Sequence, residues 1–427
     1  MKRYLNPDVS KWKTISRRPS FDFKEIEPIV LEVFEAIKNE GDSAVLNYTS
    51  TFDKVSLKSI KVLDIEIDNA IEKVSHELKN SILLAKENIE KFHSAQATKP
   101  IYVDTVEGVS CWQEKRPIEK VGIYIPGGTA VLFSSILMLA IPAKIAKCDQ
   151  VILCTPPNKD GTISPAVAYA AKICGITQIF RVGGIQAIAS MTFGTESIPK
   201  VYKIFGPGNQ YVTVAKQIAS LNHVAIDLPA GPSELLIVAD SSAKPEFVAS
   251  DLLSQAEHGI DSQVILVTTY EPLMDQVEKE ILKQLNELPR KSIVTKSMKN
   301  SKMILFNEDV DAISFINEYG PEHYIICVSN EDIYLKSVKN AGSVFVGNYT
   351  PESAGDYASG TNHTLPTNGY AKQYSGVNLD SFLKSITFQK ITKAGIRRIG
   401  PSIEIMANEE GLQAHKNAVS LRLKDLS

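Results

Sequence analysis

From Lys120 to Val346 the sequence alternates between short runs rich in β-branched residues and longer runs whose apolar residues recur at helical spacing. The strand-like run Val121–Ile125 and the helical run Leu132–Lys147 begin this alternation. Short apolar strands that alternate with helices are typical of parallel sheets covered by helices. The alternation therefore predicts an α/β protein built from parallel βαβ units.

Two parts of this alternation resemble each other. Asp149–Thr155 reads DQVILCT and Ser262–Thr268 reads SQVILVT, and each follows an apolar helical run. The repetition indicates a duplicated α/β unit, although a short apolar strand can also recur by chance. We therefore predict two similar Rossmann-like lobes with parallel-rich sheets, together with an N-terminal helical region and a C-terminal helical tail.

The expected boundaries follow the changes of pattern along the chain, whose 427 residues suffice for two or three domains. Residues 1–119 form the N-terminal helical region, which is expected to pack on the second lobe. The first lobe covers residues 120–232 and the second covers residues 233–375. The tail covers residues 376–427.

The composition argues against several classes of function. The net charge of −3 and the pI near 6.2 give no basic field for nucleic acid or an anionic membrane. The most apolar stretch, Val131–Ala143, is too short to span a bilayer. Met1–Asp8 lacks the apolar run of a signal peptide. We expect a cytoplasmic protein with no nucleic-acid or membrane partner.

Three glycine turns in the first lobe each follow a predicted strand and precede a predicted helix. They are Ile125–Thr129 (IPGGT), Val182–Ile185 (VGGI) and Phe205–Asn209 (FGPGN). Backbone N–H groups at such turns bind phosphate, so the turns are candidates for a dinucleotide or a phosphorylated ligand. None has the GxGxxG pattern, and glycine also occurs in such turns for steric reasons, so both interpretations stay open.

Two pairs of polar residues in the second lobe are candidates for chemistry. Gln255 and His258 lie three residues apart on a predicted helix and share one face, as ligands of a metal with mixed N and O donors would. Glu322 and His323 precede a predicted strand and suit general acid–base work. The alternatives are a polar helix end and a surface turn. The second pair also lies at the wrong end of its strand for the usual α/β ligand site.

Further acidic and imidazole groups lie towards the C-terminus. Asp356 is in a long loop from Gly347 to about Gly376, and Glu410 and His415 are in the helical tail. The alternatives are an Asx turn and a tail that simply docks on the core. Together Gln255, His258, Asp356 and His415 form a ligand set suited to Zn²⁺ or Mn²⁺, although spacing cannot show that they meet.

The whole chain resembles the histidinol dehydrogenase family in several long segments that occur in the family's order. These segments are Gly122–Gly128, Ile204–Asn209, Pro229–Glu234, Ser250–Gly259, Gly320–His323, Pro351–Leu365 and Ala414–Val419. The resemblance implies a homodimer with one Zn²⁺ per subunit that oxidises L-histidinol to L-histidine through the aldehyde and reduces two NAD⁺. This reaction is the last step of histidine biosynthesis.

The resemblance also implies roles for individual residues. Glu322 and His323 correspond to the catalytic residues. The implied zinc ligands are Gln255, His258, Asp356 and, from the tail of the partner subunit, His415. These six residues, together with Ser233 and Glu410, match substrate-binding positions. Tyr124, Gln186 and Asn209 match contacts with NAD⁺ in the three glycine turns.

Two other functions compete with the dehydrogenase. A solute- or metal-binding protein made of paired α/β lobes would explain the lobes and a metal site, but it gives no role to Glu322 and His323. A zinc hydrolase would use the same ligands and would need no NAD⁺. Binding without turnover, or turnover without NAD⁺, would distinguish these functions from the dehydrogenase.

Overall fold

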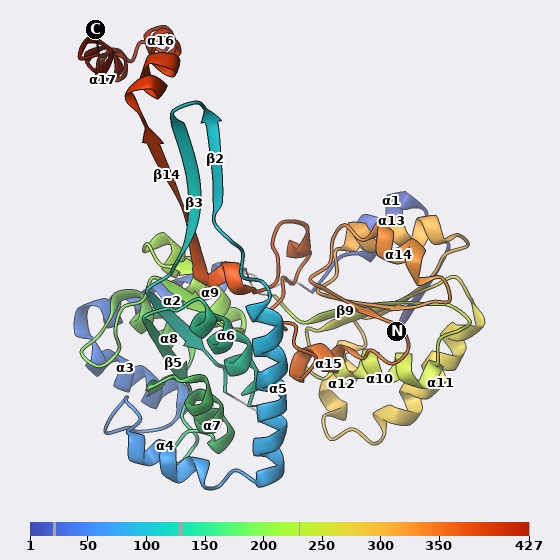
Figure 1. Ribbon diagram of the computed structural model, residues 1–427. Coiled ribbons are helices and arrows are strands. Elements are labelled where there is room, and N and C mark those ends of the chain that lie inside the picture. Colours follow the sequence, from blue (N-terminus) through green and yellow to red (C-terminus); the bar gives the residue numbers. More distant parts are fainter. Residues whose placement is uncertain (20–22, 128–130, 230, 427) are drawn as a thin grey trace.

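The computed structural model describes residues 1–19, 23–127, 131–229 and 231–426. Two parallel sheets, each covered by helices, form two lobes that lie side by side, and an arm projects from the first lobe (Figure 1). The predicted α/β class with two Rossmann-like lobes is confirmed. None of the helices among the described residues is long and apolar enough to cross a membrane.

The first lobe contains a five-stranded parallel sheet in the order β6-β5-β4-β7-β8. Its strands are β4 (Lys120–Tyr124), β5 (Gln150–Thr155), β6 (Gln178–Arg181), β7 (Lys203–Phe205) and β8 (Ala225–Ile226). The helices between them are α6 (Ser134–Ile145), α7 (Pro165–Cys174), α8 (Gly184–Phe193) and α9 (Gln210–Leu221). The order of the strands reverses between β4 and β7, and ligands of open α/β sheets bind beyond the carboxyl ends of the strands at such a point.

The second lobe repeats this order in a six-stranded sheet, β1-β11-β10-β9-β12-β13, in which β1 is an added edge strand. Its strands are β1 (Lys2–Leu5), β9 (Glu234–Ala239), β10 (Gln263–Thr268), β11 (Lys302–Leu305), β12 (His323–Cys327) and β13 (Ser343–Val346). The shared order supports the predicted duplication. Apart from the added strand β1, the first strand of each lobe along the chain is β4 or β9, and both lie where the order of the strands reverses.

Burial on both faces explains the continuous apolar runs of the second sheet. Leu235 and Ile237 of β9 pack with α10 (Pro245–Ala256), α11 (Pro272–Leu285) and α12 (Lys291–Ser297). Leu236 and Val238 point to the opposite face, as successive strand residues must, and pack with α1 (Val9–Ile15) and α13 (Asp309–Tyr319). The two remaining helices of this lobe are α14 (Glu331–Ser337) and α15 (Glu352–Tyr357).

The N-terminal region divides between the lobes, so the prediction that residues 1–119 pack on the second lobe is wrong for most of it. Of the elements described in this region, only β1 and α1 lie with the second sheet, where β1 pairs with β11. The other described helices of this region are α2 (Phe23–Glu40), α3 (Asp42–Tyr48), the π-helix η1 (Thr49–Asp53), α4 (Asp64–Ile71) and α5 (His76–Ser94). Helix α2 packs on α8 and α9, while α5 packs on α6, because their apolar stripes cover the two faces of the first sheet.

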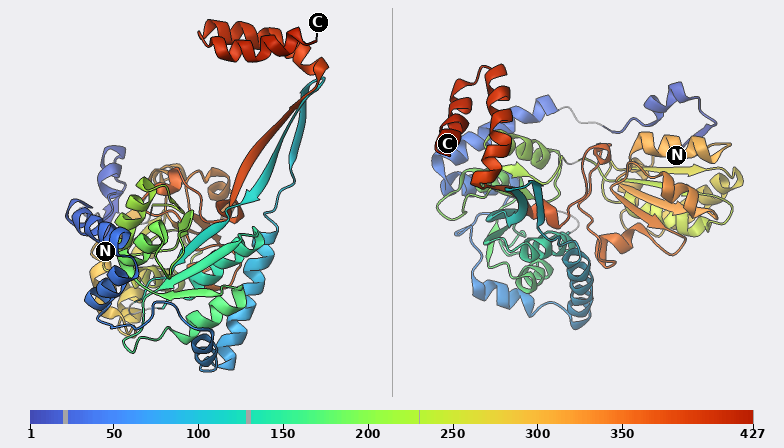
Figure 2. Two further views of the ribbon diagram at one scale, coloured as in Figure 1. Left: turned by 90° about the vertical axis from the view of Figure 1, so that its left-hand side faces the viewer. Right: turned by 45° about the horizontal axis from the view of Figure 1, so that its top comes forward.

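An antiparallel arm was also missed, because residues 101–117 were expected within a helical region. Strands β2 (Ile101–Val106), β3 (Val109–Pro117) and β14 (Leu383–Ile391) form a three-stranded sheet in the order β14-β3-β2. Two short 3-10 helices precede β14 along the chain, η2 (Tyr370–Lys372) and η3 (Leu379–Phe382). The arm ends in the helical tail, α16 (Lys393–Glu409) and α17 (Gln413–Lys424), far from the cleft between the lobes (Figures 1 and 2).

Candidate active site

A cavity of about 380 Å³ lies between the two lobes. The first lobe contributes the turn from Gly206 to Asn209, which follows β7, and the second contributes Ser233, His258 and Glu322. The cavity therefore joins the carboxyl ends of the strands of one sheet to the amino ends of the strands of the other. This arrangement explains why Glu322 and His323 lie at the start of a strand, and a cleft of this kind is a common ligand site.

A buried ion pair shapes the glycine turn after β7. Lys216 pairs with Asp227, and both side chains are buried. The Gly206 N–H donates to the carboxylate of Asp227 at 2.8 Å, while Lys216 Nζ donates to the Gly206 carbonyl oxygen at 2.9 Å. Gly206 has φ +132°, and a Cβ there would collide with the carbonyl of Tyr124, so only glycine fits. Asn209 caps α9 by accepting from the backbone N–H groups that follow it.

Glu322 and His323 are both buried and held by the backbone of one residue. The Glu234 N–H donates to the carboxylate of Glu322 at 2.8 Å, and His323 Nδ1 lies 3.0 Å from the Glu234 carbonyl oxygen. Because a carbonyl oxygen only accepts, Nδ1 carries a proton, so in the neutral imidazole the lone pair is on Nε2. Among the described residues, Nε2 has no hydrogen-bond partner. In the neutral form Nε2 is therefore available to a proton on a substrate.

Possible metal ligands surround His323. One ligand atom from each of His258, Glu352 and Asp356 lies within 4.8 Å of the others. Asp356 is 3.7 Å from His323 Nε2, which is an ion-pair distance and too long for a hydrogen bond. The structure thus brings His258 and Asp356 together, about a hundred residues apart in the sequence, beside the acid–base pair.

The position of the Gln255 side-chain amide indicates whether a cation fits among these possible ligands. One of its terminal atoms lies 2.7 and 3.2 Å from the two carboxylate oxygens of Glu352. If that atom is nitrogen, it donates to the carboxylate. If it is oxygen, it joins a cluster of carboxylate oxygens that repel one another unless a cation lies between them. Together with His258, this set of N and O donors suits a divalent ion such as Zn²⁺.

Burial and mutual charge strongly shift the titration of these groups. Burial raises the pKa of Glu322 to about 8. Burial also raises the pKa of Glu352 to about 8, and the negative charge of Asp356 reinforces the shift. For Asp356 the positive charge of His323 outweighs burial and lowers the pKa. Burial would lower the pKa of His323, but the charges of the surrounding carboxylates, chiefly that of Glu322, raise this pKa to about 10. Strong perturbation of several groups in one cleft is typical of an active site.

The three predicted NAD⁺ contacts differ in position. Asn209 lines the cavity. Tyr124 is buried and its hydroxyl accepts from the Gly184 N–H at 3.1 Å, while Gln186 is buried and donates to Asp53 at 3.1 Å. These two side chains do not line the described cavity. In the first of the predicted glycine turns, residues 128 and 129 lie outside the described residues.

Two predicted residues are not near the cavity in a single chain. Glu410 follows α16, His415 lies in α17, and both are exposed. Figure 2 shows these helices at the far end of the arm. Ser233, in contrast, lines the cavity as expected for a residue that contacts substrate. A contribution from Glu410 or His415 would therefore have to come from a second chain.

Two residues near the predicted ligands did not emerge from the sequence. Glu352 lies four residues before Asp356 on α15, and this i,i+4 spacing is the signal that could have revealed it. His363 lines the cavity, and its Nε2 lies 3.2 Å from the Ser135 hydroxyl. It lies in an irregular segment, so no periodicity points to it.

Comparisons with known proteins agree with this architecture. The family model described as histidinol dehydrogenase matches residues 16–423. Histidinol dehydrogenase of Bacteroides thetaiotaomicron is 56% identical over 426 residues, with 100% of both chains covered. The chloroplastic histidinol dehydrogenase of Arabidopsis thaliana is 49% identical, with 100% of this chain and 92% of the relative covered. The crystal structure of histidinol dehydrogenase from Elizabethkingia anophelis has a TM-score of 0.98 and 57% identity, with 100% of this chain and 98% of the other covered. The chain therefore belongs to the histidinol dehydrogenase family.

Proposed function

We propose that this protein is a zinc-dependent enzyme that oxidises L-histidinol to L-histidine through L-histidinaldehyde and reduces two NAD⁺, the last step of histidine biosynthesis. The observation that carries the proposal is the buried Glu322–His323 pair beside the donor cluster, in a cavity between two Rossmann-like lobes. Membership of the family supports the choice of substrate.

Gln255, His258 and Asp356 would hold the zinc, with the partner subunit's His415 as the remaining ligand. When bound, the ion would fix the imidazole and amine of histidinol and act as a template and charge clamp. Glu352 lies within the same cluster, so its carboxylate would contribute negative charge to the site. A cation among these carboxylates would oppose their effect on His323 and favour the neutral imidazole that a base requires.

His323 would take the hydroxyl proton of the substrate through Nε2, because Nδ1 is occupied by the Glu234 carbonyl. In each half-reaction the substrate carbon would lose a hydride to NAD⁺, which is the chemistry this cofactor supplies. In the second half-reaction Glu322 would activate the water that hydrates the aldehyde, for which a pKa near neutrality is suited. Retention of the reactive aldehyde in the cavity between the lobes would limit its loss to solvent.

For NAD⁺, Asn209 is the best placed of the three proposed contacts because it lines the cavity beside the turn after β7. Tyr124 and Gln186 stay proposals, and each would need to become accessible when the cofactor binds. Ser233 and the partner's Glu410 would contact the substrate.

A homodimer with a shared active site fits the exposed arm. The edge strand β2 exposes Ile101, Tyr102 and Val103 at 60%, 66% and 50%, and no strand among the described residues pairs with its outer edge. Apolar side chains on an open strand edge favour pairing with another chain. A second copy docked on the arm would carry α17 towards a cavity other than its own.

The direct test is the appearance of NADH absorbance when zinc-loaded protein is mixed with L-histidinol and NAD⁺. We expect two NADH per histidinol consumed. Binding of histidinol in a calorimeter without any NADH would instead favour a solute-binding protein. Product formation without NAD⁺ would favour a hydrolase.

The raised pKa of Glu352 predicts that zinc uptake releases protons. Below about pH 8 this carboxyl is protonated in the ion-free protein, and a nearby divalent cation favours its ionised form, so binding expels the proton. Above that pH the carboxyl is already ionised and its share of the release disappears. We expect calorimetric heats of zinc binding to depend on the ionisation enthalpy of the buffer most strongly below pH 8, and less above it, where His323 still has a proton to lose but Glu352 does not.

The variant Glu352→Gln provides the control for this titration. Its glutamine cannot ionise, so proton release below pH 8 should fall, while Glu322 continues to contribute. Equal heats in buffers of different ionisation enthalpy at the lower pH would contradict the prediction.

A further inference from the structure

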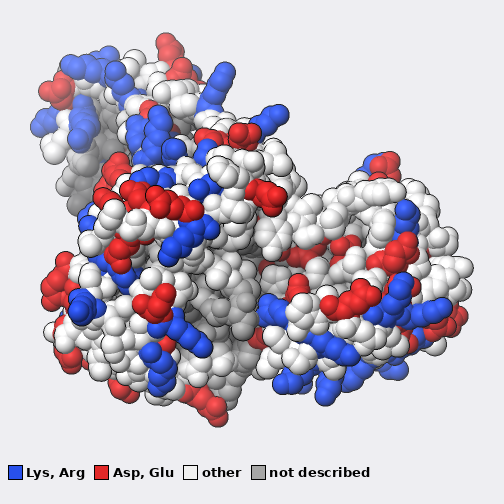
Figure 3. Space-filling view, turned by 90° about the horizontal axis from the view of Figure 1, so that it is seen from below, with Lys and Arg blue, Asp and Glu red and all other residues white. Residues whose placement is uncertain are grey.

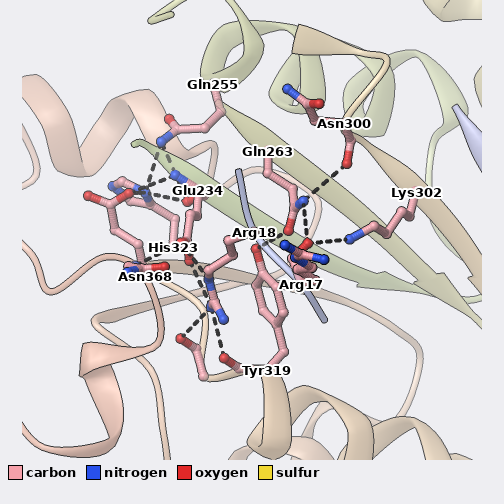
Figure 4. A network of polar contacts seen from close by, with 12 residues as sticks. Arg17, Arg18, Glu234, Gln255, Gln263, Asn300, Lys302, Tyr319, His323 and Asn368 are labelled. Carbon is pink, nitrogen blue, oxygen red and sulfur yellow. Dashed lines mark hydrogen bonds and ion pairs between the residues drawn. The ribbon is translucent and has the colours of Figure 1, made fainter. Parts of the chain in front are cut away.

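A largely buried arginine from the N-terminal segment reaches the residue that holds the catalytic pair (Figure 4). Arg18 forms a forked interaction with the carboxylate of Glu234, with its Nε at 2.6 Å and one terminal nitrogen at 2.9 Å. The same nitrogen also donates to the carbonyl oxygen of Tyr319 at 2.8 Å. The side chains of Arg18 and Glu234 are only 12% and 2% exposed, so the ion pair is shielded from solvent. A forked pair of this kind fixes orientation as well as distance.

Glu234 connects Arg18 to both catalytic groups through its backbone. Its N–H holds the carboxylate of Glu322, and its carbonyl oxygen holds Nδ1 of His323. Glu234 is the first residue of β9 and lies beside the start of β12, where the two strands run parallel. One bond is made by the peptide group before the Glu234 Cα and the other by the peptide group after it, so a displacement of Glu234 would disturb both.

The segment that carries Arg18 is itself fastened to the second lobe. Lys302 Nζ donates to the Arg17 carbonyl oxygen at 3.0 Å, and the Gln263 side-chain amide donates to the same oxygen at 3.2 Å. The ring of Tyr319 lies under the guanidinium, with Cζ of Arg18 3.9 Å from the centre of the ring. The hydroxyl of Tyr319 donates to the side-chain oxygen of Gln263 at 3.0 Å. The N–H of Asn368 also donates to the carboxylate of Glu234 at 2.7 Å. Contacts other than the ion pair with Glu234 therefore also fix the position of the guanidinium.

We infer that Arg18 is a positioning residue for the oxidation chemistry: its ion pair with Glu234 fixes the peptide groups that orient Glu322 and His323. This inference rests on the proposed function, in which that pair performs the proton transfers. Arg18 touches neither catalytic side chain, and its contribution is the alignment of the Nε2 lone pair and the carboxylate with the substrate. Small errors in such alignment are costly in rate.

The test uses the full-length, zinc-loaded protein with Arg18→Lys and Arg18→Met. For Arg18→Met we expect kcat to fall by roughly 10- to 100-fold. The KM values for histidinol and NAD⁺ should stay within about 2-fold and the zinc content unchanged, because no binding group is removed. Arg18→Lys keeps a charge but not the fork, so it should restore part of kcat. Glu234→Gln examines the same contact from the other side should Arg18→Met fold poorly.

Lys302→Met is the matched control. It removes another buried cation of the same segment. The hydrogen bonds of the Lys302 side chain end on the backbone carbonyls of residues 15 and 17, and the Gln263 amide still holds the Arg17 carbonyl when they are lost. We expect a lower unfolding temperature with kcat within about 3-fold of the unmodified enzyme. Equal losses of kcat in Lys302→Met and Arg18→Met would overturn the inference, as would an unchanged kcat in Arg18→Met.

A His323→Asn variant measured in parallel distinguishes the role of His323 as the base from the positioning role of Arg18. If it retains full activity, the role of His323 as the base has failed, and the positioning role falls with it. If the unmodified, zinc-loaded protein forms no NADH from histidinol, the proposed function itself has failed. If His323→Asn is inactive while Arg18→Met and Glu234→Gln both turn over normally, only the positioning role is wrong.

Discussion

Replacement of His323 by asparagine is expected to lower kcat for histidinol oxidation by roughly 10³-fold, the loss typical of a missing general base. The side chain is buried, its Nδ1 is occupied by the Glu234 carbonyl, and its Nε2 faces the donor cluster without a hydrogen-bond partner among the described residues. Asparagine can still donate to that carbonyl, but it has no basic nitrogen. Steady-state kinetics with both substrates at saturation measures the effect.

Zinc content should be unaffected by this change, because His323 is not one of the proposed ligands. His223→Asn is a suitable control: it also removes an imidazole, but His223 is exposed and has φ +64°, a conformation that asparagine tolerates well. Loss of zinc from His323→Asn would show that the residue belongs to the metal site. Full activity in that variant would refute its role as the base.

The fold could be predicted where burial imposes a pattern on the sequence. The strands Glu234–Ala239 and Gln263–Thr268 are buried on both faces, so they are continuous apolar runs that alternate with helices. An amphipathic stripe, as on α2, indicates that one face is covered but not which sheet covers it. Residues 101–106 form a strand that the sequence does not predict. Almost all of them are exposed, so their apolar residues follow neither the helical period nor the strand period.

The site was predictable as separate pieces. The helix period predicts Gln255 and His258 on one helix face, but α10 ends at Ala256, so only Gln255 lies in the helix and His258 follows its end. The Glu322–His323 pair is conspicuous by its chemistry. Their meeting depends on the parallel pairing of β9 with β12, which puts Glu234 beside Glu322 although 88 residues separate them. Arg18 depends on a longer connection still, because it lies 216 residues before Glu234. Such contacts follow from tertiary packing, and a single sequence carries no local trace of them.

The proposal that His415 comes from a second chain can be tested by mixing two inactive variants. His415→Asn removes the tail ligand and should leave a homodimer that binds zinc weakly and turns over little. Since α17 lies at the end of the arm, away from its own cavity, the proposed dimer would place this defect in a different subunit's site from the defect of His323→Asn. Each variant alone is expected to be inactive.

Mixing the two variants under conditions that exchange subunits should restore activity. A heterodimer then combines a body with intact His323 and a tail with intact His415 in one of its two sites, whereas the other site carries both defects. With random exchange half of the dimers are heterodimers, so recovery should approach about a quarter of the unmodified activity. Mixing His323→Asn with Glu322→Gln is the control, because both defects lie in the body and no exchange rebuilds a site. If the first mixture also stayed inactive although exchange had occurred, the tail would serve its own chain or no site at all, and the shared active site would be refuted.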